Sequence, residues 1–186
     1  STKDDPQTIV NRIWNGRVKF YRQAANVGAI KNFNTCVQRA KGEFVHILHG
    51  DDWVKDGIYE EVSKAFDEYP DLGIVITGCS DFDENSRLLK SPIEITSLLC
   101  PSSKIDNFLY SNPIRPPGVV IKKAVYEAIG NFDESLIHCA DWDMWVRAIH
   151  NFGGLFIPND LASYRIFPGN DTSKLTLSGE NLRDYQ

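Results

Sequence analysis

Two adjacent acids, Asp51 and Asp52, are the residues of this 186-residue chain whose type and spacing most directly indicate chemistry. They follow an apolar run of strand length at 44–48. Neighbouring side chains of a regular strand point to opposite faces, so both carboxylates reach one ligand only where the strand ends and the backbone turns. Carboxylates at such a strand end hold hard divalent cations together with substrate phosphates. The pair therefore predicts a cation site, with a solvated Asp-Asp turn as the alternative.

A second acidic pair, Asp141 and Asp143, stands at the start of a predicted helix in the segment HCADWDMWVRA. Residues two apart do not share a helix face, so the two carboxylates have different surroundings. Asp143 precedes Arg147 by four residues, which predicts an ion pair, whereas Asp141 is typical of an N-cap or a first-turn charge. Trp142 and Trp145 are expected in the core or in a wall, with stacking on a sugar face as the alternative.

The elements that must position these acids alternate between strand and helix, which indicates the α/β class. Apolar runs and helical spacing carry this assignment, and no internal repeat is visible. Strands are predicted at 17–21, 44–48, 73–77, 118–121, 155–158 and 163–167. Helices are predicted from the Asn-Val-Gly turn to about residue 40 and at 56–69, 105–110, 123–129 and 141–151, with a polar arm at the end.

The length, charge and apolar stretches of the chain indicate which broad classes of protein it can belong to. The 186 residues, 42% of them hydrophobic, suit one folded domain. Twenty Lys and Arg against 25 Asp and Glu leave a net charge of −5, which argues against broad binding to nucleic acid or anionic lipid. The apolar stretches are far shorter than the roughly 20 residues of a membrane span, and no leader opens the chain. We expect neither a span nor a secretion signal.

The four cysteines are too widely spaced for a zinc site. Without a CxxC or a Cys/His cluster, they are typical of buried thiols in a reducing compartment, with disulfides as the alternative. A cytoplasmic location is the expectation. These residues are Cys36, Cys79, Cys100 and Cys139.

Three blocks stand in order along the chain: NVGAIKNFNTCVQRAKGEFVHILHGDDWV, GNFDESLIHCADWDMWVRA and SYRIFPGNDTS. Taken together, they resemble the family 2 glycosyltransferases of the GT-A fold. The resemblance implies a Rossmann-like, mostly parallel sheet flanked by helices. It also implies a glycosyltransferase domain over 1–168, incomplete at its N-terminus because the first strands of the family precede the point where this chain opens, and a C-terminal arm over 169–186.

The same resemblance assigns the first acidic pair to the sugar donor. Asp51 matches the family's aspartate near the nucleotide ribose, and Asp52 matches the ligand of a Mg or Mn ion that bridges the diphosphate. Stabilisation of charge on the departing diphosphate is the chemistry that such an ion supplies.

Four further positions are carried over from the family. Asp141 matches the general base of inverting members, which takes a proton from the acceptor hydroxyl. Arg165 matches an arginine near the diphosphate, and Asn26 and Gly28 match the turn that shapes the donor site.

Three positions depart from the family pattern. His49 replaces an acid two residues before the aspartate pair, which changes the local charge and the expected metal affinity. Ala140 stands where many members have Glu, and Phe167 stands where many have a histidine that joins the metal site.

The leading hypothesis is therefore transfer of a sugar from a nucleotide-diphosphate donor to a glycan or lipid-linked acceptor, in polysaccharide or cell-surface glycan synthesis. The location is cytoplasmic, with peripheral contact at the inner face of the membrane as an alternative. A non-catalytic binding or scaffold domain of the same fold is the competing interpretation. A nucleotidyltransferase ranks last, because the Gly-rich phosphate loop it requires is not visible near the start.

Overall fold

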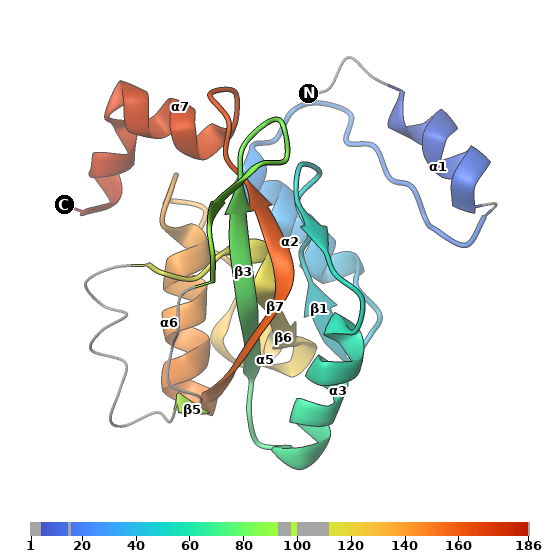
Figure 1. Ribbon diagram of the computed structural model, residues 1–186, viewed down its shortest axis with the longest axis vertical. Coiled ribbons are helices and arrows are strands. Elements are labelled where there is room, and N and C mark those ends of the chain that lie inside the picture. The colour runs from blue at the N-terminus through green and yellow to red at the C-terminus, as the bar shows by residue number, and fades with distance from the viewer. Residues whose placement is uncertain (1–4, 15, 93–97, 100–111, 186) are drawn as a thin grey trace.

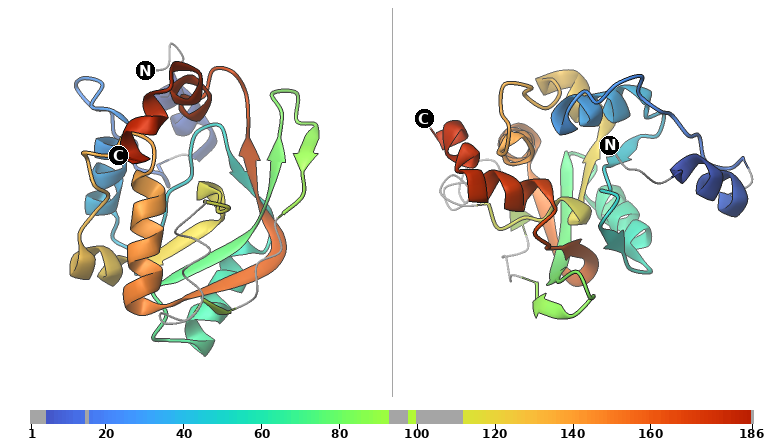
Figure 2. Two further views of the ribbon diagram at one scale, coloured as in Figure 1. Left: turned by 90° about the vertical axis from the view of Figure 1, so that its left-hand side faces the viewer. Right: turned by 90° about the horizontal axis from the view of Figure 1, so that it is seen from above.

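A central sheet lies between helices in the computed structural model, which describes residues 5–14, 16–92, 98–99 and 112–185 (Figures 1 and 2). The strands run in the order β1-β6-β3-β7-β2, with β4 paired to β3 and β5 paired to β7. Their bounds are β1 Phe44–His46, β2 Trp53–Val54, β3 Ile74–Phe82, β4 Leu88–Lys90, β5 Leu98–Leu99, β6 Val119–Lys122 and β7 Gly154–Arg165.

The helices cover both faces of this sheet. The α-helices are α1 Pro6–Trp14, α2 Ala29–Arg39, α3 Ile58–Glu68, α5 Lys123–Ile129, α6 Ala140–Phe152 and α7 Asp171–Ser178. Two 3-10 helices, η1 Pro116–Gly118 and η2 Glu180–Tyr185, complete the elements of the described residues.

Alternation along β3 explains why helices cover both faces. Ile74 and Ile76 point to one face and pack in a core with α2, α5 and α6. Val75, between them, points to the other face and packs against α3. All three side chains are at most 1% exposed, so this strand is covered on both faces.

The α/β class is confirmed, but the strand directions correct one expectation. Among the described strands, only β3 and β7 pair in parallel, and the other pairings are antiparallel. The sheet is therefore mixed and not mostly parallel. The reason is that β6 enters between β1 and β3 in the opposite direction to both.

Most of the predicted strands and helices are present, but α1, β2, β4 and β5 lie where no element was predicted. Three predictions also differ from the structure. Residues 17–21 contain no strand, and 155–167 holds the single long strand β7 where two short ones were predicted. The polar end of the chain, predicted as an arm, forms α7 and η2. The predicted helix at 105–110 lies outside the described residues.

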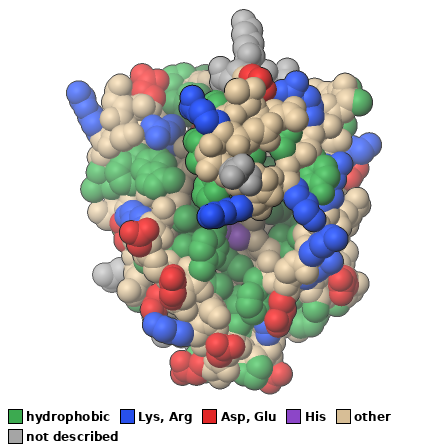
Figure 3. Space-filling view, turned by 90° about the vertical axis from the view of Figure 1, so that its right-hand side faces the viewer, with side chains coloured by type: hydrophobic (Ala, Val, Ile, Leu, Met, Phe, Trp, Pro, Cys, Tyr) green, Lys and Arg blue, Asp and Glu red, His purple; other side chains and the backbone are tan. Residues whose placement is uncertain are grey.

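Helix α1 stands apart from the layers in the views of Figures 1 and 2. None of its residues is buried, and Ile9, Ile13 and Trp14 are about half exposed. Seen from the side of β1 and α3, apolar side chains run down the middle of the surface around a histidine (Figure 3). Basic side chains gather toward the upper end of this face and acidic ones toward the lower end.

Among the cysteines that the structure describes, Cys36 and Cys79 are free thiols, and Cys139 is partly buried. Cys36 is exposed, so the expectation of a buried thiol is wrong there, because this residue of α2 lines an open pocket and does not join the core. Cys100 lies outside the described residues. In the described part of the chain, no helix has the length and apolar character that a bilayer crossing requires.

Candidate active site

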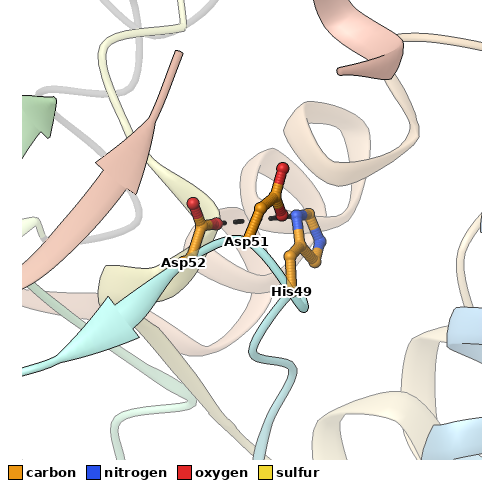
Figure 4. Close-up of side chains that lie close together, drawn as sticks. All are labelled: His49, Asp51 and Asp52. Atoms are coloured by element: carbon orange, nitrogen blue, oxygen red, sulfur yellow. Dashed lines mark ion pairs between the residues drawn. The ribbon is translucent and has the colours of Figure 1, made fainter. Parts of the chain in front are cut away.

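A tight turn at the end of β1 brings three possible metal ligands together. The backbone N–H of Asp52 donates to the carbonyl of His49 at 3.3 Å, which closes the turn. His49, Asp51 and Asp52 each offer one atom that could ligate a metal, and these three atoms lie within 4.8 Å of one another (Figure 4). The strand end therefore places both acids where one cation can meet them.

Asp52 is the most constrained of the three. Its Oδ1 accepts a hydrogen bond from the backbone N–H of Arg165 at 2.9 Å, while its buried Oδ2 has no hydrogen-bond partner in the described part of the chain. Burial raises the pKa of Asp52 to about 7, and the charge of Asp51 acts in the same direction. A buried, unpartnered carboxylate oxygen is costly, and a bound cation removes that cost. The residues therefore fit a divalent ion.

His49 is a ligand candidate that the sequence interpretation treated only as a departure. Its ring stacks on Phe33 with 5.0 Å between centroids, and its Nδ1 lies 3.7 Å from Asp52 Oδ2. Burial lowers the pKa of His49, which favours the neutral imidazole that ligates metals. The position of His49, two residues before Asp51, is the feature of the sequence from which a third metal ligand could have been predicted.

Asp141 lies in the first turn of α6, as predicted. Its Oδ1 accepts a hydrogen bond from the backbone N–H of Trp142 at 2.6 Å. Burial raises the pKa of Asp141 to about 6. The residue also lines a small cavity of about 30 Å3, together with the apolar side chains of Trp145 and Phe132. A carboxyl group with such a pKa is ionised at neutral pH and still able to accept a proton.

The other acid of α6, Asp143, has the structural role predicted for it. Its Oδ2 lies 2.7 Å from Arg147 Nη2, and Arg147 also donates to the carbonyls of Ile129 and Asn131. The ion pair orients Arg147, and the bonds from Arg147 to these carbonyls link α6 to the end of α5.

A pocket of about 670 Å3 opens between α2, the turn after β1, the start of α6 and the segment after β7. Asp51 and Asp141 both line it, and Asp52 lies beside it in the same cluster as Asp51. The structure thus brings the two predicted acidic motifs to one cavity. Other lining residues are Phe33, His49, Arg115, His138, Trp142, Tyr164 and Thr172.

Arg165 is not among the residues that line this pocket. Its guanidinium donates to the backbone carbonyls of Asp51, Asp83 and Glu84, and it lies 4.9 Å from the ring centroid of Trp53. Together with its backbone bond to Asp52, these contacts fix the acidic turn in place.

Asn26 and Gly28 form the turn before α2. Asn26 Oδ1 accepts a hydrogen bond from the backbone N–H of Gly28 at 2.9 Å. Gly28, the N-cap of α2, has a φ of 83°, which favours glycine. Both residues are exposed, and the pocket wall on this side begins at Ala29.

Arg115 is a residue of the pocket that the sequence did not reveal. It precedes η1 in a segment without regular periodicity, and its guanidinium forms a two-point ion pair with Asp81. Its positive charge lowers the pKa of both Asp52 and Asp141, against the larger effect of burial. It therefore lies close to both acidic motifs.

Asp184 of η2 holds in place the segment before α6, which lines the pocket. Its carboxylate accepts hydrogen bonds from the backbone N–H groups of Ile137, His138 and Cys139 at 2.7–3.2 Å. Burial acts to raise the pKa of Asp184, but these bonds outweigh it and hold that pKa below its ordinary value. The two partners of this contact are more than 40 residues apart in sequence, so no local sequence pattern predicts it.

The sequence profile of the family described as glycosyl transferase family 2 matches residues 1–127. This chain belongs to glycosyl transferase family 2. Two of the predicted donor-site motifs, the Asn26–Gly28 turn before α2 and the Asp51-Asp52 pair after β1, fall within the matched residues. Membership confirms the resemblance found in the sequence.

Two curated relatives extend the match beyond residue 127. An uncharacterised glycosyltransferase of Methanocaldococcus jannaschii is 25% identical over 171 residues, covering 91% of this chain. An uncharacterised protein of Mycobacterium tuberculosis is 22% identical over 197 aligned positions, covering 100% of it. The family 2 chain spans 57% and 61% of the lengths of these two relatives.

Solved structures show the same fold. A crystal structure of S. aureus TarS matches with a TM-score of 0.68 at 16% identity, covering 89% of this chain and 49% of that one. A structure of TarS in complex with UDP matches with a TM-score of 0.68 at 17% identity, covering 90% and 49%. At this identity the likeness supports the GT-A architecture of the family 2 chain.

Proposed function

We propose that this chain is the catalytic domain of a glycosyltransferase that moves a sugar from a nucleoside-diphosphate donor to an acceptor hydroxyl, with inversion and with a divalent cation. The observation that carries the proposal is the meeting of Asp51 and Asp141 at one pocket, beside the buried Oδ2 of Asp52, which has no hydrogen-bond partner among the residues that the structure describes. A cation at the leaving diphosphate and a base at the acceptor are the two groups that suit metal-dependent inverting transfer.

Asp52, with His49 and Asp51, would hold the Mg or Mn ion, which when bound offsets the negative charge that develops on the diphosphate. In this proposal Asp51 also contacts the donor ribose, as the family resemblance implies. Arg165 supports the diphosphate site by fixing the acidic turn, and Asn26 and Gly28 shape the donor side through the start of α2.

Asp141 is the proposed base. The acceptor oxygen forms a bond to the anomeric carbon while the bond from that carbon to the diphosphate oxygen breaks. The acceptor proton passes to the Asp141 carboxylate, and the nucleoside diphosphate leaves with the electron pair of the broken bond. A base on the face opposite the leaving group gives inversion.

The acceptor is a glycan or lipid-linked hydroxyl, in polysaccharide or cell-surface glycan synthesis, at a cytoplasmic location or at the inner face of the membrane. UDP in the TarS structure supports a nucleoside diphosphate as the donor's leaving group.

Calorimetric titration with UDP and GDP, each with and without Mn, tests the donor site. We expect cation-dependent binding of one nucleotide, and loss of the cation dependence in Asp52→Asn. Asp67→Asn, an exposed acid of α3, is the matched control and should bind as the unaltered chain does. Cation-independent binding that Asp52→Asn leaves unchanged contradicts the metal assignment. Binding without sugar transfer in an acceptor screen favours the scaffold interpretation.

A further inference from the structure

Arg115 is held rigidly at the rim of the pocket. Its Nε donates to Asp81 Oδ1 at 2.9 Å and its Nη2 donates to Asp81 Oδ2 at 2.7 Å. Asp81 is 4% exposed and lies on the central strand β3. A two-point bond to a buried carboxylate fixes both the position and the plane of a guanidinium.

The ion pair uses only one edge of the guanidinium. Among the described residues, Nη1 of Arg115 has no hydrogen-bond partner, although its two N–H groups are strong donors. The ring of Tyr164 lies 5.1 Å from the guanidinium carbon and supports it through a cation–π contact. The side chain is 32% exposed and lines the pocket together with Asp51 and Asp141.

Arg165 offers an internal comparison. Both arginines lie near the acidic turn, but the Nε and Nη1 groups of Arg165 are already engaged by backbone carbonyls, and it does not line the pocket. Arg115 therefore supplies the guanidinium that is oriented toward the pocket and retains donors there.

Neutralising Asp81 does not by itself explain this arrangement. The pocket wall also contains the carboxylates of Asp51 and Asp141, so a fixed cation that lines the same pocket suits a ligand that brings additional negative charge. We propose that Arg115 is a substrate-binding residue whose Nη1 donates to a phosphate or carboxylate oxygen of the ligand in this pocket. The identification of that ligand as a sugar donor or acceptor rests on the function proposed above.

NMR of the arginine side-chain Nε–Hε groups detects a ligand at the neighbouring Nη1, because an anion bound there changes the electronic environment of the whole guanidinium. Arg115→Lys assigns the Arg115 signal by removing it. The folded chain is titrated with pyrophosphate, UDP, UDP-glucose and UDP-glucuronate, each with and without Mg. We expect a saturable shift of the Arg115 signal. A shift with pyrophosphate and UDP identifies a phosphate contact, and a shift confined to UDP-glucuronate identifies a sugar carboxylate.

A charge-paired variant separates binding from structure. Asp81→Asn combined with Arg115→Gln removes both charges, so no buried charge is left without a partner. We expect this double variant to bind the ligand that shifts the Arg115 signal about tenfold more weakly. The reason is that a hydrogen bond to a charged group contributes about 1.5–3 kcal/mol. Arg87→Gln, an exposed arginine, is the control. Arg115→Lys keeps a cation beside Asp81 and should weaken binding as well, so the comparison survives if the double variant does not fold.

The proposal is overturned if the Arg115 signal responds to none of the four ligands, or if both Arg115 variants bind as the unaltered chain does. Failure of the proposed function looks different: Asp52→Asn then leaves Mg-dependent UDP binding intact while the Arg115 signal still responds to an anion.

Discussion

The Asp141 carboxylate is held at a free-energy cost beside an apolar cavity. Burial raises its pKa from 3.8 to about 6, so between these pH values the folded chain binds a proton that the unfolded chain releases. Stability from this residue is therefore lost as pH rises from about 4 to about 6. At neutral pH the ionised side chain strains the fold and at the same time serves as the proposed base.

Asp141→Asn tests both consequences. We expect release of nucleoside diphosphate from the sugar donor to fall roughly 10²–10⁴-fold, the usual contribution of a general base, with donor binding near normal. At pH 7.5 we expect a gain in unfolding free energy on the order of 2 kcal/mol, since one pKa unit corresponds to about 1.4 kcal/mol. Denaturant unfolding beside the control Asp67→Asn measures the gain. Equal loss of binding and transfer, or lower stability, contradicts the assignment.

The pH dependence of transfer follows from the same pKa. With saturating Mn, we expect the transfer rate to be level above about pH 7 and to fall about tenfold for each pH unit below 6, because protonated Asp141 cannot accept the acceptor proton. A rate profile from pH 5 to 8 measures this limb. A rate that stays level down to pH 5 excludes Asp141 as the titrating base.

At the scale of elements, β7 shows where a local pattern misleads. Pro158 interrupts the apolar run and predicted two short strands, yet β7 continues through it beside β3. The pairing register shifts on both sides of Gly78, which absorbs the interruption as a bulge. A Cβ on Gly78 would lie 2.8 Å from the carbonyl oxygens of Pro158 and Asn159.

Gly78→Ala should therefore destabilise the sheet by about 1–3 kcal/mol, the usual range for forcing a group into a close-packed site. Chemical denaturation measures the change. Gly50→Ala, where an added Cβ meets nothing within 4 Å, is the matched control. Equal stability of the two variants would show that β7 moves freely away from β3.

The link between η2 and α6 is a contact between elements that no sequence periodicity reveals. Asp184→Ala should remove the acceptor of three backbone N–H groups and cost about 1–2 kcal/mol, as for a lost helix cap. Hydrogen exchange should quicken at residues 137–139 and in α7. Asp171→Ala, an exposed acid on α7, is the control. The Asp184 pKa lies below its ordinary value, so this contribution is present at neutral pH and lost on acidification.

Across the whole molecule, local signals were predictable and long-range ones were not. The helical spacing of apolar residues predicted α2, α3, α5 and α6, and the acids at a strand end predicted the acidic turn. Each of these features depends on residues that are close in sequence. The antiparallel entry of β6, the Arg115–Asp81 pair and the Asp184 contact join segments 34 to 78 residues apart. Pairing at such distances depends on the folded chain, so a single sequence does not specify it.

Strand β1 has one strand neighbour among the described residues, β6, which leaves its other edge without a strand partner. Such an edge is a template for another chain, and the three-residue length of β1 keeps that template short. Mutual repulsion between molecules of net charge −5 opposes this association at neutral pH and vanishes near the isoelectric point of about 5.3. Colloidal stability is therefore lowest in the same acidic range in which Asp141 gains its proton, and rate measurements there call for dilute protein.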